Sequence, residues 1–137
     1  MNVQRLIAPW LSLTSTISTK NMRYRSKLRA SLIKNSNYDG SIDNHHIIPK
    51  QFCCHSVISE LEFDIHGSEN IIMLPNKYMS KRFHIVHRGP HKQYNNYVKC
   101  ELDSMQGLSG DELRYQFWLF FANLASRIND NDVSIPW

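Results

Sequence analysis

The chain has 137 residues, of which 42% are hydrophobic and 11% aromatic. This content is enough for one compact domain with its own core, and it excludes a chain that is disordered throughout. The formal net charge is +4 at pH 7, which is moderate for the whole molecule. No stretch approaches the roughly 20 apolar residues that span a bilayer, so no membrane partner is expected.

Positive charge gathers in residues 1–38, the basic N-terminal arm. The first acidic residue is Asp39, and it is preceded by Arg5, Lys20, Arg23, Arg25, Lys27, Arg29 and Lys34. Such a segment suits the backbone of a nucleic acid, because each phosphate that it neutralises releases counterions. A solvated surface and an organelle-targeting segment are the alternatives that this composition leaves open.

Within the arm, residues 24–32 predict a short amphipathic helix with Leu28 and Leu32 on one side. Residues 35–40 follow it and combine Asn, Asp and Gly, which tolerate the left-handed conformations that turns use. The helix is therefore expected to end in a turn.

Two short strands are predicted in the middle of the chain. Residues 46–48 form one candidate, stopped by a proline, and residues 71–74 form the other, also stopped by a proline. Residues 50–70 lie between them and are too many for a hairpin turn. A connection of this length is usually functional or contains a helical turn.

Two helices are predicted in the last third of the chain. Pro90 suits the first position of a helix, which would place His91 in the first turn. A stripe follows at three- and four-residue spacing: Tyr94, Tyr97, Val98, Glu101 and Leu102.

The second helix is predicted to start with a capping box over residues 109–112, a hydroxyl followed three residues later by a carboxylate. Its apolar stripe is widened by two further aromatic residues: Leu113, Phe117, Phe120, Leu124 and Ile128, with Trp118 and Phe121. Packing of this helix on the core is favoured over a dimer or partner contact.

All seven histidines lie between residues 41 and 105. Phosphodiester hydrolysis needs an activated water, a cation at the phosphate and help for the leaving oxygen. Neutral imidazole can act as a general base near pH 7, and imidazoles also bind divalent transition metals. Neighbours in a strand point to opposite faces, so one of His45 and His46 can hold a metal while the other addresses the water. His87 and His91 are four residues apart, which puts them on one helix face or brackets a helix start.

Three ordered motifs then resemble those of the HNH endonucleases, and within them the AHH branch. They are residues 44–50 (Asn-His-His-Ile-Ile-Pro-Lys), residues 67–75 (Gly-Ser-Glu-Asn-Ile-Ile-Met-Leu-Pro) and residues 87–98, which begin His-Arg-Gly-Pro-His. The resemblance covers residues 44–98. One departure is Asn44, which stands where the branch has the alanine of its name.

The resemblance implies an α+β fold with a ββα-metal (His-Me finger) core, in which two short strands and a helix clamp one divalent ion. Residues 39–105 would form this nuclease core. The basic N-terminal arm, residues 1–38, would precede it, and residues 106–137 would add a C-terminal amphipathic helix that packs on it.

The same resemblance assigns roles to individual residues. His46 would be the general base, and Asn70 would orient the loop and the base through hydrogen bonds. The metal ligands would be His45, His91 and His87, with His84 as the alternative to His87. Phosphate contacts are expected from basic residues near the motifs: Arg88, Lys92, Lys50 and Arg82.

Other chemistry-bearing residues are expected to be structural. His66 is interpreted as a loop residue. The adjacent Cys53 and Cys54 lack the usual spacing of zinc ligands, so a zinc site with His55 is disfavoured. The three cysteines contain no C-x-x-C pair, which favours an intracellular, reducing compartment.

The leading hypothesis is a metal-dependent endonuclease that cuts DNA or RNA, with DNA favoured. The alternative is a non-catalytic nucleic-acid-binding module stabilised by a metal on the same scaffold. Imidazole ligands favour Zn²⁺, Ni²⁺ or Mn²⁺ over Mg²⁺, although a site completed by phosphate and water could use Mg²⁺. A homodimer and an inhibitor protein are the protein partners considered.

Overall fold

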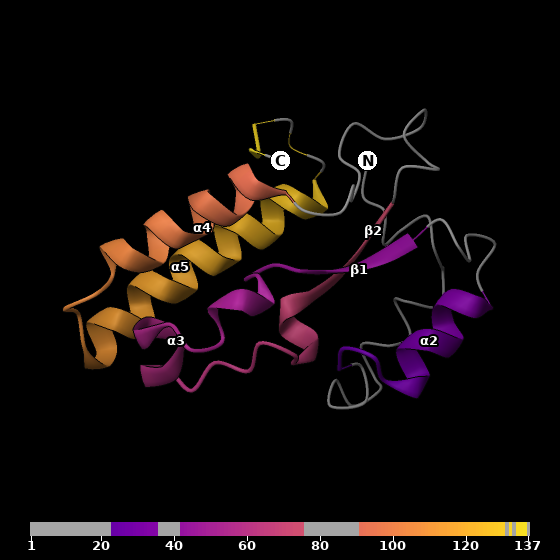
Figure 1. The fold of residues 1–137 in the computed structure, drawn as a ribbon, viewed down its shortest axis with the longest axis horizontal. Helices are drawn as coiled ribbons and strands as arrows, with labels where there is room; N and C mark the ends of the chain where they lie inside the picture. Colours follow the sequence, from indigo (N-terminus) through magenta and orange to yellow (C-terminus); the bar gives the residue numbers. More distant parts are fainter. Residues whose placement is uncertain (1–22, 36–41, 76–90, 131, 133, 137) are drawn as a thin grey trace.

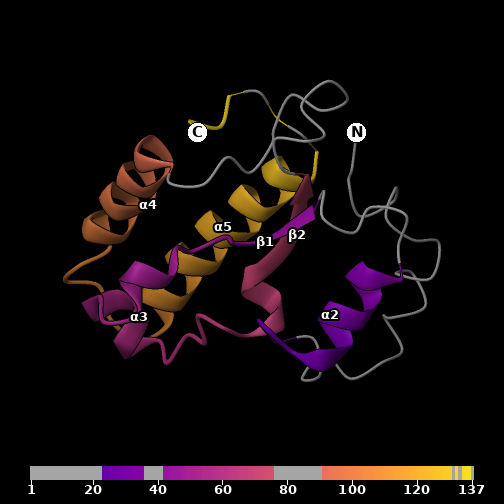
Figure 2. The same cartoon turned by 45° about the vertical axis from the view of Figure 1, so that its right-hand side comes forward.

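The computed structural model describes residues 23–35, 42–75, 91–130, 132 and 134–136. These residues form an α+β architecture around a small antiparallel sheet of β1 (Ile42–His46) and β2 (Ile71–Pro75). Helix α2 lies on one side of this sheet, and α4 and α5 lie toward the other (Figure 1, Figure 2). The α+β class expected from the sequence is therefore found.

The two strands pair in a register that places His45 opposite Ile72 and His46 opposite Ile71. The expected strand over residues 46–48 is wrong, because β1 ends at His46. The two residues that follow are buried and bind Asn70: Ile47 N donates to its backbone oxygen (2.8 Å) and Ile48 N to its side chain (2.7 Å). These bonds tie the two residues after the double histidine to Asn70.

The long connection between the strands contains helical turns, as expected. It comprises the 3₁₀ turn η4 (Lys50–Phe52), helix α3 (Ser56–Glu60) and the 3₁₀ turn η5 (Ser68–Asn70). The ring of His55 starts α3, since its Nδ1 accepts from Val57 N at 3.2 Å.

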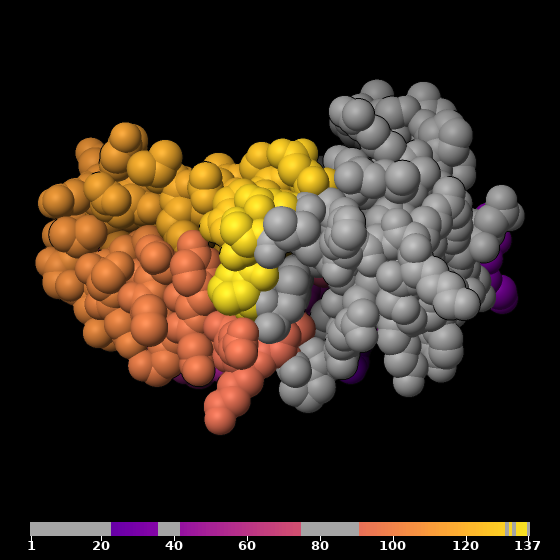
Figure 3. All heavy atoms as spheres, turned by 90° about the horizontal axis from the view of Figure 1, so that it is seen from above, coloured from indigo at the N-terminus to yellow at the C-terminus, as the bar shows by residue number. Residues whose placement is uncertain are grey.

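Helices α4 (Lys92–Ser104) and α5 (Gly110–Asn129) supply much of the core. They form one continuous face of the molecule in the view from above (Figure 3). Helix α4 buries Tyr94, Val98 and Leu102, as its stripe predicts. Its start differs from the prediction, because His91 is the N-cap residue and lies just before the first turn.

Helix α5 packs its apolar stripe into the same core cluster: Leu113, Phe117, Phe121, Leu124 and Ile128. Two details of the prediction are wrong. Phe121 takes the buried position of the stripe while Phe120 is only partly buried. The Ser109 side chain makes no capping hydrogen bond, so no capping box forms. The acidic residues of the first turn, Asp111 and Glu112, still complement the helix dipole.

Helix α2 (Lys27–Lys34) replaces the helix predicted over residues 24–32. Ser26 caps it, because its hydroxyl accepts from Arg29 N at 3.1 Å. The buried residue of α2 is Arg29, at 3% exposure, whereas Leu28 and Leu32 are half-buried. The predicted side is therefore the less exposed side of the helix, but its most buried residue is an arginine that the apolar stripe did not indicate. Of the predicted turn at 35–40, residues 36–40 lie outside the described residues.

No helix in the described ranges is both long and apolar enough to cross a membrane.

Candidate active site

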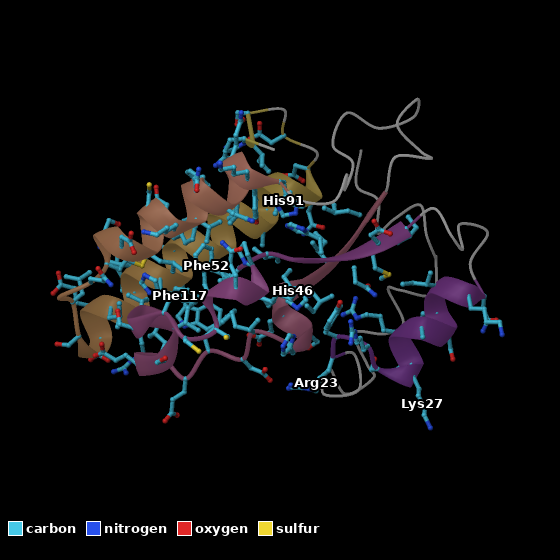
Figure 4. All side chains as sticks on the ribbon, in the orientation of Figure 1. Arg23, Lys27, His46, Phe52, His91 and Phe117 are labelled. Atoms are coloured by element: carbon cyan, nitrogen blue, oxygen red, sulfur yellow. The ribbon has the colours of Figure 1, made fainter. Side chains whose placement is uncertain are left out.

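The site is built on the last two residues of β1. His45 and His46 are both buried, at 2% and 9% exposure. Successive side chains in a strand point to opposite faces, and the two rings accordingly meet different neighbours. Figure 4 shows His91 at the start of α4 on one side of β1 and His46 on the other.

On the first face, the ligand face, His45 meets residues at the start of α4. Its ring centroid lies 5.0 Å from that of His91 and 5.1 Å from that of Tyr94. His91 Nδ1 lies 3.2 Å from Asn95 Oδ1, one helical turn further on. Because an amide oxygen only accepts, Nδ1 of His91 donates this hydrogen bond.

The donor set of the ligand face suits a divalent transition metal. Two imidazoles converge there, and a hydrogen bond of this kind on one ring is what orients histidine ligands in metal sites. Among the described residues, no group of three or more His, Cys, Asp or Glu side chains could hold a metal ion. His87 and His84, the further ligands considered from the sequence, lie outside those residues.

On the opposite face, the base face, His46 meets a second histidine. His46 Nε2 lies 3.1 Å from Nδ1 of His66. The ring of Tyr24 covers both, with centroids 4.4 Å from His46 and 5.6 Å from His66. Burial lowers the pKa of His46 from 6.5 to about 4, and the charges of His66, Lys50 and Arg29 act in the same direction. His46 is therefore neutral at pH 7.

The base face is completed by the basic N-terminal arm. Arg23 pairs with Asp64, and this hydrogen bond lowers the pKa of that carboxyl. Tyr24 N donates to His66 O at 3.0 Å. Together with the burial of Arg29, these contacts make part of the arm structural, which its charge pattern alone did not indicate.

Asn70 connects the segments around the site. Its fully buried amide accepts from Ile48 N at 2.7 Å and donates to Ile48 O and Ile65 O, both at 2.9 Å. Tyr94 adds a bond from its hydroxyl to Ile47 O at 2.5 Å. Burial raises the pKa of Tyr94, which keeps the hydroxyl protonated as a donor. The segment after His46 is thus held from η5 and from α4.

The basic residues expected to contact phosphate are only partly described. Lys50 is exposed and close enough to His46 to depress its pKa. Lys92 is exposed on the first turn of α4. Arg82 and Arg88 lie outside the described residues.

Sequence reasoning missed His66, which it interpreted as an ordinary loop residue. The missing information is the fold, because 20 residues separate it from His46. The ring of His55, for which a zinc site was disfavoured, lies with its Nε2 2.8 Å from Asp103 Oδ1. Cys53 and Cys54 are exposed thiols with sulfurs 3.5 Å apart.

A comparison with protein families now identifies the class of protein. The model of the AHH family, described as a nuclease family of the HNH/ENDO VII superfamily with conserved AHH, matches residues 26–116. The chain belongs to this nuclease family, which confirms the resemblance seen in the motifs. The match is wider than the motifs, since it takes in α2 and the start of α5. No curated protein and no solved structure matches the chain.

Asn44 stands at the position before the two histidines that name the family. Its Oδ1 lies 3.4 Å from Nη1 of Arg29, which donates to it. The departure from alanine thus supplies an acceptor for the buried arginine of α2.

Proposed function

We propose that the protein is a metal-dependent endonuclease that hydrolyses phosphodiester bonds of DNA, or of RNA, with His46 as the general base. The observation that carries this proposal is the division of the double histidine. His45 lies with His91 on one face of β1, and His46 lies in a separate buried cradle on the other. A ligand and a base are thereby adjacent in sequence without competing for the same ion.

His45 and His91 would hold the ion, with His87 as the third expected ligand, in a ββα-metal arrangement of β1, β2 and α4. Nucleases of this superfamily generally use a divalent metal. When bound, such an ion stabilises the negative charge that develops on the phosphate and on the leaving oxygen. The candidate ions are Zn²⁺, Ni²⁺, Mn²⁺ and Mg²⁺, and a cleavage assay with each ion in turn distinguishes them.

His46 would take a proton from the attacking water while the water oxygen bonds to phosphorus and the 3′-oxygen departs. A base must be neutral to do this, and the low pKa of His46 ensures that state. The charge of a phosphodiester beside the ring raises its pKa again, which strengthens the base when substrate is bound. Lys50, which is exposed and whose charge acts on His46, would attract that phosphate.

Asn70 and Tyr94 would act on the backbone rather than on substrate. They hold Ile47 and Ile48, the residues directly after His46, by hydrogen bonds from two different elements. The position of the base relative to the ligand face would depend on these bonds, because a strand end without them could shift.

The proposal is tested by cleavage of supercoiled plasmid and of structured RNA, with Mg²⁺, Mn²⁺, Ni²⁺ and Zn²⁺ in turn. Metal-dependent cutting is expected, and His46→Ala should lower the rate by roughly 10²–10⁴-fold, the usual contribution of a general base. Glu60→Gln, an exposed change on α3 outside the three motifs, is the control and should cut like wild type.

Folded wild-type protein that binds nucleic acid and a metal but cuts neither substrate with any of these ions would contradict the proposal. The metal-stabilised binding module would then explain the same fold, because zinc binding can supply folding free energy.

A further inference from the structure

His66 is an exposed residue, but its side chain contacts a buried histidine. It lies in the loop before η5, yet its Nδ1 is 3.1 Å from Nε2 of the buried His46. An exposed ring gains little from burial of apolar area, so this contact contributes little to stability. It does fix where a hydrogen-bonding nitrogen sits beside His46.

The loop around His66 is held in place from several directions. Its backbone nitrogen donates to Asp64 Oδ1 at 3.2 Å, and its backbone oxygen accepts from Tyr24 N at 3.0 Å. The Tyr24 ring stacks on its ring with an interplanar angle of 16°. Arg23 then secures Asp64 through both carboxylate oxygens. His66 is thus the end of a chain of contacts that starts in the basic N-terminal arm.

The pairing of two imidazoles constrains the position of one hydrogen. A neutral imidazole has one nitrogen that donates and one that accepts, and which one donates is set by its partners. If Nε2 of His46 donates to His66, then Nδ1 of His46 keeps its lone pair and is the nitrogen that can receive a proton from water. If the direction is reversed, Nδ1 carries the hydrogen and the base is blocked.

We infer that His66 is a positioning residue for His46: its Nδ1 accepts from Nε2–H of His46, and this holds both the ring and the tautomer that a general base needs. The inference rests on the proposed function of His46. His66 itself neither touches the reacting atoms nor binds the ion.

The first test measures the tautomer directly, without activity. Full-length protein with ¹⁵N-labelled histidine, loaded with zinc, is examined by NMR at pH 7, where a ring nitrogen with hydrogen and one with a lone pair differ clearly in shift. Wild-type His46 should carry its hydrogen on Nε2. His66→Leu should shift His46 toward a mixture of tautomers. A wild-type His46 with its hydrogen on Nδ1 overturns the inference.

The second test measures cleavage by two variants of similar size. In His66→Asn, Oδ1 stands at the same number of bonds from the backbone as Nδ1 of histidine and can accept the same hydrogen bond. In His66→Leu, no acceptor remains. We expect His66→Leu to lower kcat by roughly 10–100-fold, by analogy with the loss of an orienting partner of a metal-ligating histidine. His66→Asn should recover most of kcat, and KM should stay close to that of wild type in both.

Equal kcat for wild type and His66→Leu overturns the inference, as does a loss in kcat of the same size in both variants. The melting temperature is measured for each, so that a folding defect is recognised separately. If wild type cuts no substrate, the proposed function fails, while the tautomer of His46 still decides whether His66 holds it.

Discussion

The two faces of β1 are built in different ways, although they carry neighbouring histidines. The ligand face is assembled from α4, whose first residues bring His91 and Tyr94 to His45. The base face is assembled from a loop and from the basic N-terminal arm, through His66 and Tyr24. The ligand face depends on the spacing of residues within one helix. The base face depends on segments that are far apart in the chain and share no periodic pattern.

The two faces should therefore respond to substitutions in different parts of the chain. Changes in α4 should act on metal affinity, and changes in the arm or in the loop around His66 should act on the base. Asn70 and Tyr94 hold the backbone directly after His46, so changes there should affect both faces.

The largest contrast is expected between His45→Ala and His46→Ala. Loss of the His45 ligand should weaken zinc or manganese binding by more than the roughly 10–100-fold typical of losing an orienting partner of a ligand. His46→Ala should leave metal affinity close to wild type while abolishing most cutting. Isothermal titration calorimetry measures the affinities. Equal loss of affinity in both variants would remove the distinction between the faces.

Asn70→Ala should disturb both faces, because it should lower the stability of the folded protein. The change removes a fully buried amide and leaves the backbone groups of Ile48 and Ile65 without partners. The free energy of unfolding should fall by roughly 2–5 kcal/mol, given the cost of unsatisfied buried groups. Urea denaturation measures it, with Asn96→Ala, an exposed change on α4, as the control. A loss no greater than that of the control would mean that Asn70 does not hold the segment.

Tyr94→Phe should have a smaller effect of the same kind. The ring stays against His45 and His91, and the hydrogen bond to Ile47 O is lost. We expect the free energy of unfolding to fall by about 1–2 kcal/mol, the cost of a buried carbonyl that loses its donor. Tyr115→Phe, at a position 65% exposed, is the control and should match wild type. If Tyr94→Phe slows cutting but leaves the free energy of unfolding unchanged, the hydroxyl contacts the substrate instead.

A further effect concerns pH and the base face alone. The pKa of His46 is lowered to about 4 in the folded protein, against about 6.5 in an unfolded chain. Between these values the unfolded chain binds the proton and the folded protein does not. Stability from neutral His46 is therefore complete above pH 6.5 and declines as pH falls toward 4.

This decline is measured by urea denaturation between pH 4 and 7.5, with a chelator present. His46→Gln should show a shallower dependence on pH than wild type in that window. Identical slopes in the two proteins would show that His46 titrates normally.

Much of the ligand face could be predicted from the sequence. Alternation in a strand separates His45 from His46, and the stripe of α4 places Tyr94 in the core. The errors lie at boundaries: β1 ends before Ile47, and α4 begins after His91. Each boundary lies one or a few residues from its predicted place, and local periodicity does not fix the terminal residue of an element.

The base face could not be predicted in the same way. A basic segment predicts affinity for phosphate, but Arg23 pairs with Asp64 and Arg29 is buried beside Asn44. These partners lie 41 and 15 residues away. Charge composition cannot distinguish a solvated arginine from one that holds the fold together, because the difference is made by distant partners.

The sequence by itself determined the nuclease family, the two strands and helices that surround the double histidine, and the opposite orientation of its rings. These follow from motif order and from the repeat of strands and helices, which are local properties of the chain. Only the tertiary structure brought His66 and Tyr24 to His46 and buried Arg29 against β1. Such contacts join segments that are far apart in the sequence and share no periodic pattern, so they exist only once the chain has folded.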